Sequence, residues 1–202
     1  MLNILLCILI GYLFGTSNLA FFISRMKKVN LREQGSKNLG TANATVVLGP
    51  KFGVLVFLHD TLKVVMAILL CKLLFANVPH VTYIVGTAAV LGHIFPFYLN
   101  FKGGKGFASS IGLAMMIDWR YGLALLVAIA VISLITDWLV AGTFFTIAIT
   151  PIFVAFIDIV SALIIVVASI CIFVKHIENI KKKKLGQEIG IRQTLFKKKK
   201  KE

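Results

Sequence analysis

Charged residues are scarce in this chain, and acidic ones are the scarcest. Of its 202 residues only 15% are charged, with 8 Asp and Glu against 22 Lys and Arg, while 58% are hydrophobic and the mean hydropathy is +0.92. A soluble globular domain carries roughly a quarter charged residues. A soluble fold could not hide this much apolar surface, so the composition excludes an ordinary cytosolic enzyme and a disordered chain. It indicates a protein whose solvent is lipid.

Several catalytic and metal-binding signatures are also missing. Cys7, Cys71 and Cys171 lie far apart, each within an apolar run, and are expected to be small buried hydrophobic residues. No His, Cys and carboxylate set has metal-ligand spacing, and there is no Gly-x-Ser-x-Gly elbow, P-loop or Gly-x-Gly-x-x-Gly fingerprint. The sequence therefore predicts no metal and no cofactor. Any catalysis must rest on positioning and charge stabilisation.

Seven apolar stretches predict helices in a membrane, where a span needs about 20 apolar residues. The stretches are 2–23, 52–75, 81–101, 107–117, 121–135, 140–157 and 159–174. The fourth is too short to cross a hydrocarbon core of about 30 Å at about 1.5 Å per residue. It needs a thinned bilayer or part of the preceding glycine loop. The expected fold class is an all-α integral membrane protein with about seven transmembrane helices.

Positive charge gathers on one predicted side of this bundle. The loops after the first and third stretches are basic, and 11 of the 22 Lys and Arg follow Val174. The positive-inside rule places these segments in the cytoplasm, with the N-terminus outside and the C-terminus inside a cell inner or plasma membrane. The tail, 177–202, contains the runs Lys181–Lys184 and Lys197–Lys201. We expect it to contact anionic membrane lipids and no nucleic acid.

The cytoplasmic loop 30–43 has the composition of an anion site. Gly35 and Gly40 let the backbone turn, and successive free N–H groups form a nest that binds anions. Arg32 and Lys37 add positive charge. The alternative is a solvated basic loop that only fixes the topology.

A second loop on the same side strengthens the case for an anion site. His93 lies shortly before Lys102, Gly103, Gly104 and Lys105. Glycines beside lysines suit a phosphate, because bare backbone donors are combined with mobile ammonium groups. His176, Asn179 and Glu188 follow the last apolar stretch on the same side. Three segments therefore predict a site for an anionic, phosphate-bearing substrate at the membrane surface.

Charged residues inside an apolar stretch are costly and are candidates for function. His59, Asp60 and Lys63 fall in the stretch 52–75, and Asp60 and Lys63 lie three apart on one helical face, where they can pair. A role at the site is one interpretation, and a self-neutralising structural pair is the other.

At these residues the sequence resembles the bacterial acyl-phosphate:glycerol-3-phosphate acyltransferases, over nearly its whole length. The resemblance lies in four patches that occur in the family's order: Gly35-Ser36-x-Asn38-x-Gly40-x-x-Asn43, preceded by Ser17 and Arg32; Asp60 with Lys63; Gly92-His93-x-Phe95-Pro96 with Phe101-Lys102-Gly103-Gly104-Lys105-Gly106; and His176-x-x-Asn179 with Gly186 and Glu188. The third patch matches most closely.

The resemblance implies transfer of a fatty acyl group from acyl phosphate to the 1-hydroxyl of glycerol 3-phosphate, which yields lysophosphatidic acid and phosphate. It implies a transmembrane acyltransferase domain over 1–176, followed by the basic tail. The expected catalytic residues are Ser36, His93 and Lys102. The expected substrate-binding residues are Arg32, Gly35, Asn38, Gly40, Asn43, Asp60, Lys63, Gly103, Gly104, Lys105, His176 and Asn179. The hydroxyl proton would go either to a substrate phosphate or to His93.

The chain departs from the family's pattern at several positions. Asn30 stands where the family has Asp, and Val46 and Asp137 where it has Arg. Thr41-Ala42 inverts Ala-Thr, Val64 replaces Gly, and Val140 and Thr143 replace two Ser. Lost cations favour the alternative of a non-catalytic or substrate-altered relative that binds phosphorylated lipids. A transporter of a small anion is a further alternative, which the apolar outer half of the chain opposes.

Overall fold

The computed structural model describes residues 1–188 and 190, which form helices and connecting loops without a β-strand. The helices are α1 (Leu2–Thr16), α2 (Leu19–Met26), α3 (Thr41–Leu48), α4 (Pro50–Leu74), α5 (Val81–Ile94), the 3₁₀ turn η1 (Phe97–Leu99), α6 (Phe107–Ile117), α7 (Trp119–Thr136), α8 (Leu139–Ala155) and α9 (Ile159–Lys184). By length and composition, five stretches could each cross a membrane: Leu2–Met26, Pro50–Leu74, Val81–Leu99, Trp119–Thr136 and Ile159–Lys184. The helices α6 and α8 are apolar but shorter. The prediction of an all-helical membrane protein is therefore confirmed.

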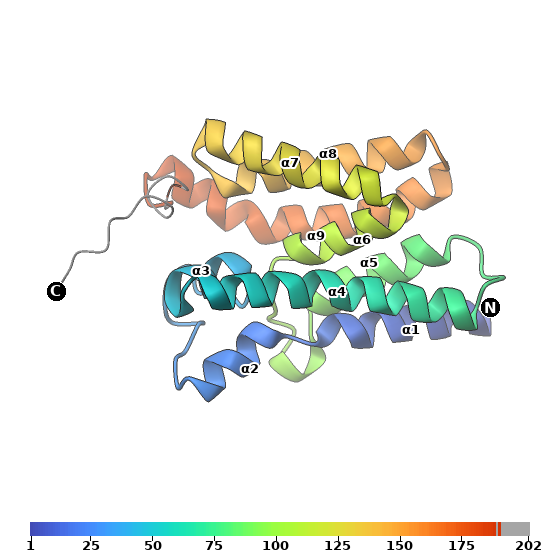
Figure 1. Ribbon diagram of the computed structural model, residues 1–202, viewed down its shortest axis with the longest axis horizontal. Helices are drawn as coiled ribbons and strands as arrows, with labels where there is room; N and C mark the ends of the chain where they lie inside the picture. Colours follow the sequence, from blue (N-terminus) through green and yellow to red (C-terminus); the bar gives the residue numbers. More distant parts are fainter. Residues whose placement is uncertain (189, 191–202) are drawn as a thin grey trace.

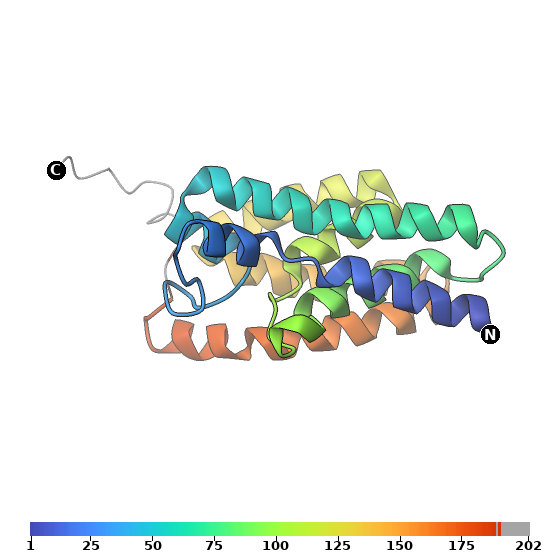
Figure 2. The same cartoon turned by 90° about the horizontal axis from the view of Figure 1, so that it is seen from below.

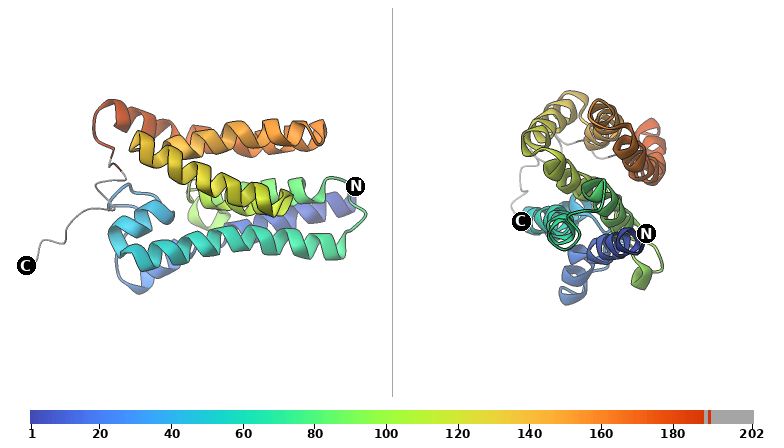
Figure 3. Two further views of the ribbon diagram at one scale, coloured as in Figure 1. Left: turned by 45° about the horizontal axis from the view of Figure 1, so that its top comes forward. Right: turned by 90° about the vertical axis from the view of Figure 1, so that its right-hand side faces the viewer.

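The helices run roughly along one axis, with α5 at the centre (Figure 1). α5 contacts α1, α4, α6 and α9, and a second layer forms where α7 packs on α8 and α8 on α9. The N-terminus and the α4–α5 connection lie at one end of the bundle, whereas α2, α3 and the end of α9 lie at the other (Figures 1 and 2). Seen along the bundle in Figure 3, the α7–α9 layer stands apart from α1 and α4. The basic loop after α2 and the basic end of α9 therefore share one end.

Glycines let α1 and α5 approach each other closely. A Cβ on Gly15 would lie 2.0 Å from the Ala89 carbonyl oxygen, and one on Gly11 would lie 2.5 Å from that of Val85. Gly11 and Gly15 are four residues apart, the spacing that places small residues on one face of membrane helices. Gly92 completes the contact from α5, where a Cβ would lie 2.2 Å from the Tyr12 carbonyl oxygen. This contact fixes the height of His93 relative to the end of α1.

The first apolar stretch, 2–23, lies within one candidate membrane span, Leu2–Met26, as expected, but it does not form one unbroken helix. The chain leaves the helical conformation at Ser17 and starts again as α2, with Asn18 as N-cap. The Asn18 side chain accepts a hydrogen bond from the Phe21 N–H at 2.8 Å. That N–H would otherwise bond to the Ser17 carbonyl, which instead accepts from Lys63 Nζ at 2.6 Å. The buried Lys63 thus takes the place of the helical hydrogen bond at the break between α1 and α2.

Three other boundaries differ from the sequence-based expectation. The segment 41–48, expected to belong to loops, forms α3. The stretch 81–101 stops being α-helical at Ile94, just before Pro96, and continues as η1. The helix α9 runs to Lys184, ten residues past the expected end of the last stretch. The proposed boundary between 1–176 and 177–202 therefore lies inside α9, and the run Lys197–Lys201 is outside the described residues.

Candidate active site

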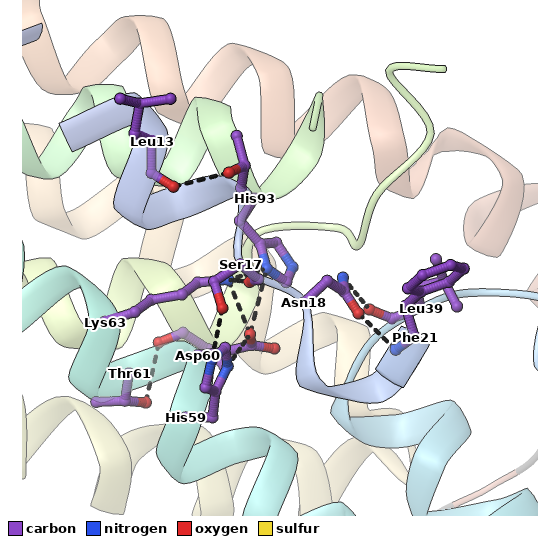
Figure 4. Close-up of polar contacts among 12 residues, drawn as sticks. Leu13, Ser17, Asn18, Phe21, Leu39, His59, Asp60, Thr61, Lys63 and His93 are labelled. Carbon is purple, nitrogen blue, oxygen red and sulfur yellow. Dashed lines mark hydrogen bonds and ion pairs between the residues drawn. The ribbon is translucent and has the colours of Figure 1, made fainter. Parts of the chain in front are cut away.

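A buried polar centre lies where the break after α1 meets α4 and α5 (Figure 4). Asp60, Lys63 and His93 are 1%, 6% and 3% exposed. Lys63 Nζ lies 2.9 Å from Asp60 Oδ1 and 2.8 Å from His93 Nδ1, and it donates to the Ser17 carbonyl. The expected pair between Asp60 and Lys63 is therefore present. The same lysine also contacts a histidine that the sequence placed in a different motif.

His59 and Ser17 extend this centre toward the surface. His59 Nε2 lies 3.0 Å from Ser17 Oγ, and its Nδ1 lies 3.3 Å from Asp60 Oδ1. Both residues stood out in the sequence, Ser17 beside the first family patch and His59 among the charged residues of the stretch 52–75, but neither was assigned a catalytic or substrate-binding role. A further signal for Ser17 was the polar pair Ser17-Asn18 inside an otherwise apolar run, since such a pair favours a break in a membrane helix.

The loop 30–40 is tied to the second loop through its backbone. Arg32 donates from Nη2 to the carbonyls of Lys102, at 2.8 Å, and Leu99, at 3.3 Å. The Leu39 carbonyl accepts from Asn18 Nδ2 at 3.2 Å, and a Cβ on Gly104 would lie 3.0 Å from that same oxygen. The two loops predicted to share a face are therefore in contact.

Asn43 holds the first loop together from inside. Its Oδ1 accepts from the Ser36 N–H at 2.7 Å, and its Nδ2 donates to the Leu31 and Asn38 carbonyls, both at 2.9 Å. Asn43 is only 1% exposed. Gly35 sits in the turn beside it with φ of +58°, and a Cβ there would lie 2.2 Å from Asn43 Oδ1. Asn43 and Gly35 shape the loop, and the Ser36 side chain is left exposed.

The glycine-rich loop lies directly on His93. The Gly103 and Gly104 N–H groups donate to the carbonyls of Ile94 and His93, each at 3.1 Å. A Cβ on Gly103 would lie 2.0 Å from the His93 carbonyl oxygen, and one on Gly104 would lie 2.1 Å from His93 Nε2. Only glycine lets the backbone pass this close to the imidazole. The loop ends at Gly106, with φ of +88°, where α6 begins.

The third segment reaches the site through Lys105. Its Nζ donates to Asn179 Oδ1 on α9, and Asn179 Nδ2 donates to Glu188 Oε1 at 2.7 Å. Burial lowers the pKa of the Lys105 ammonium below that of an ordinary lysine. His176, 4% exposed, donates from Nδ1 to the Ile172 carbonyl at 2.8 Å. Lys102, in contrast, has an exposed side chain at the rim.

The described residues contain no group of three His, Cys, Asp or Glu that could hold a metal ion. Two buried hydroxyls near the starts of helices, Thr41 Oγ1 on α3 and Ser109 Oγ on α6, have no hydrogen-bond partner within residues 1–188 and 190. Both helices also have free N–H groups in their first turn. The arrangement offers hydrogen-bond donors and cations to an anion.

The departures from the family's pattern have different structural consequences. Asn30 Oδ1 accepts from the Arg32 N–H at 3.0 Å, which is the turn that an aspartate would make. Val64 is fully buried beside Gly112. Val46 is 48% exposed on α3, so a cation is lost from an open surface. Asp137 ends α7 in the left-handed conformation and lies close to Gly190.

Comparison with known proteins gives a consistent result. The chain matches the family described as glycerol-3-phosphate acyltransferase over residues 5–186. It is 31% identical to glycerol-3-phosphate acyltransferase 1 of Oceanobacillus iheyensis, over 86% of this chain and 88% of that protein. It is 37% identical to the glycerol-3-phosphate acyltransferase of Streptococcus thermophilus, over 89% of each.

Two solved structures are also similar. Both are crystal structures of PlsY (YgiH), an integral membrane glycerol 3-phosphate acyltransferase. The glycerol 3-phosphate form has a TM-score of 0.86 at 30% identity, and the lysophosphatidic acid form has 0.83 at 29%. Each comparison covers 96% of this chain and 98% of the solved chain.

Proposed function

Because the chain belongs to the glycerol-3-phosphate acyltransferase family, and is thus an acyltransferase of phospholipid synthesis, we propose that its donor is an acyl phosphate and its acceptor glycerol 3-phosphate. The 1-hydroxyl oxygen attacks the acyl carbonyl carbon, and the bond from that carbon to the phosphate oxygen breaks. Phosphate leaves with the electron pair, and lysophosphatidic acid is the other product. An acyl phosphate is already activated, so no nucleophile from the protein is needed.

The observation that carries this proposal is the convergence of cationic segments on the glycine-rich loop. Arg32 is bonded to the backbone of Lys102, and Lys105 is bonded to Asn179. Donor and acceptor both carry phosphate, so the site must neutralise two anions. We assign Arg32, Lys102 and Lys105 to the phosphates. Ser36, Asn38 and the N–H groups of Gly35 and Gly40 fix the acceptor. Gly103 and Gly104, whose N–H groups already donate to Ile94 and His93, leave room for it beside the loop.

A small cavity beside this loop has room for about one water molecule, and it must widen for an acyl chain to enter. It lies between α5, α6, α8 and α9, and its lining includes Val90, Ser110, Thr146, Ile165, Ala168 and Ile172. Ile172 also faces Gly106, where a Cβ would lie 3.0 Å from its Cγ1. The cavity therefore starts beside the glycine-rich loop and leads between apolar helices. An acyl chain placed there would have its carbonyl carbon close to the phosphates.

The charge distribution supports a cytoplasmic site in a seven-span topology. Counting α6 and α8 as crossings beside the five long stretches makes seven, an odd number that would put the two termini on opposite sides. The end of the bundle with α2, the loop 30–40 and Lys181–Lys184 carries the basic residues. By the positive-inside rule this end faces the cytoplasm. Lys181–Lys184 would meet anionic lipid headgroups there.

The experiment measures turnover of the purified protein in detergent with palmitoyl phosphate and glycerol 3-phosphate. We expect phosphate release and lysophosphatidic acid formation in equal amounts, and no product from palmitoyl coenzyme A. Lys102→Ala and Ser36→Ala should abolish turnover, whereas Lys51→Ala, an exposed lysine at the start of α4, should not. Folded protein without turnover would instead support a non-catalytic or substrate-altered relative, the alternative that Val46 and Asp137 favour.

A further inference from the structure

The ammonium of Lys63 has no donor left for a substrate. A lysine ammonium has three N–H donors, and Lys63 Nζ has three partners: the Ser17 carbonyl at 2.6 Å, Asp60 Oδ1 at 2.9 Å and His93 Nδ1 at 2.8 Å. The side chain of Lys63 is 4% exposed. A phosphate could reach this ammonium only by displacing a buried partner, which leaves that partner unsatisfied. The contact geometry thus argues against direct substrate binding by Lys63.

Charge balance decides which partner on the Lys63–His93 contact donates. A neutral amine could accept from His93 Nδ1–H, but Asp60 would then be a buried carboxylate without a compensating charge on Lys63. Burying an unpaired charge is far more costly than burying a hydrogen-bonded ion pair. His59 also faces Asp60, yet at 3.3 Å it is farther than Lys63 and is partly exposed. Lys63 is therefore the cation and the donor, and His93 Nδ1 is the acceptor.

The hydrogen of His93 must then sit on the other ring nitrogen. In a neutral imidazole one nitrogen donates and the other accepts. Since Nδ1 accepts from Lys63, Nε2 carries the hydrogen. Nε2 lies against the backbone of Gly104, in a side chain that is 3% exposed. No hydrogen bond among the described residues uses Nε2. This N–H faces the glycine-rich loop to which we assign the phosphates.

From this geometry, and resting on the proposed function, we infer that Lys63 is a positioning residue that fixes His93 as the Nε2–H tautomer. His93 then donates a hydrogen bond to an oxygen of the reacting substrates beside Gly104 and does not take the hydroxyl proton. The hydroxyl proton then goes to a substrate phosphate, the other acceptor expected from the sequence. Asp60 keeps Lys63 charged, and the Ser17 carbonyl orients it.

The first test is spectroscopic and needs no substrate. Protein with ¹⁵N-labelled histidine is studied in detergent micelles, and His93→Gln identifies the resonances. We expect a hydrogen on Nε2 and none on Nδ1 between pH 6 and 9, the range over which a free imidazole is neutral or nearly so. In Lys63→Met, Nδ1 should gain the hydrogen, because it can then donate to Asp60 Oδ1, 3.4 Å away. An imidazolium, or a bare Nε2 in the wild-type protein, would overturn the inference.

The second test separates positioning from substrate binding. Lys63→Met should lower kcat at least tenfold while the KM for glycerol 3-phosphate changes less than threefold. Lys72→Met, an exposed lysine on the same helix, is the control. A rise in KM with an unchanged kcat would assign Lys63 to a substrate phosphate and refute the inference. If the wild-type protein has no turnover, the proposed function fails, and the spectroscopic test still decides the tautomer.

The third test asks what His93 supplies. Gln can place an N–H near the position of Nε2 but has no basic nitrogen, whereas Asn places its amide near Nδ1. We expect His93→Gln to keep kcat within about tenfold and His93→Asn to lose far more. Equal loss in both variants, with an alkaline rise in rate confined to the wild-type protein, would restore His93 as the base.

Discussion

Replacing Asn43 should unfold the loop 30–40 and leave the helical bundle intact. Its side-chain amide makes three hydrogen bonds from a position that is 1% exposed. Each contributes about 1 kcal/mol net, so Asn43→Ala costs about 3 kcal/mol of loop stability. If catalysis requires the ordered loop, this loss lowers kcat/KM by up to roughly 100-fold. The reason is that the Ser36 N–H loses its hydrogen bond to Asn43 Oδ1, so that Ser36 is no longer held in position.

Asn43→Asp is the sharper variant because it keeps the acceptor. The carboxylate can still accept from the Ser36 N–H, but it cannot donate to the Leu31 and Asn38 carbonyls, and it turns a negative oxygen toward them. We expect it to be at least as damaging as Asn43→Ala. If Asn43 only bound substrate, its substitution would leave the loop 30–40 of the substrate-free protein unchanged.

Hydrogen exchange of the Ser36 amide, measured without substrate, checks this reasoning. The amide should be protected in the wild-type protein and exchange much faster in both Asn43 variants, while amides of α5 keep their protection. Asn77→Ala, an exposed asparagine at the opposite end of the bundle, should change neither exchange nor turnover. Unchanged Ser36 protection in Asn43→Ala would refute the loop-organising role and return Asn43 to the substrate-binding set.

Three further outcomes are expected. Val46→Arg restores a cation whose side chain reaches back over the first turn of α3. It should lower the KM for glycerol 3-phosphate roughly fivefold, which corresponds to about 1 kcal/mol in this exposed setting. An unchanged KM would place this position outside the site. Ala168→Phe should fill the cavity between α5, α6, α8 and α9 and reduce kcat/KM for palmitoyl phosphate more than for a short-chain donor. Ala124→Phe, on the exposed face of α7, should not change kcat/KM for either donor. Because burial lowers the pKa of Lys105, this lysine loses its charge at lower pH than an exposed lysine, so kcat/KM should fall as pH rises through that pKa. In Lys105→Arg, which stays charged, the fall in kcat/KM should occur at higher pH. If the fall occurs at the same pH in both proteins, Lys105 is excluded from phosphate binding.

The location of the polar groups along the chain was predictable because lipid leaves few options for them. Charged and amide residues in an apolar sequence must gather in loops or pair within the bundle. Asp60 and Lys63, three apart on one helix, could therefore be paired from spacing alone. The alternation of apolar stretches, which returns every second connection to the same side, predicted that the two basic loops share a side, and the structure showed that they are in contact. The partner of the helix break was not accessible from the sequence, since the Ser17 carbonyl accepts from Lys63, which is 46 positions further along the chain.

The sequence by itself determined the solvent, the helical class and the set of residues able to bind an anion, because composition and spacing fix these locally. The tertiary structure decided which of those residues have donors to spare. The Asn43 amide is hydrogen-bonded within its own loop, and the Lys63 ammonium is hydrogen-bonded to Ser17, Asp60 and His93. Hydrogen-bond capacity is limited and is shared with partners that only the fold brings within reach. The residue type determines which hydrogen-bond donors and acceptors a side chain has, and the fold determines which of them remain unpaired for a ligand.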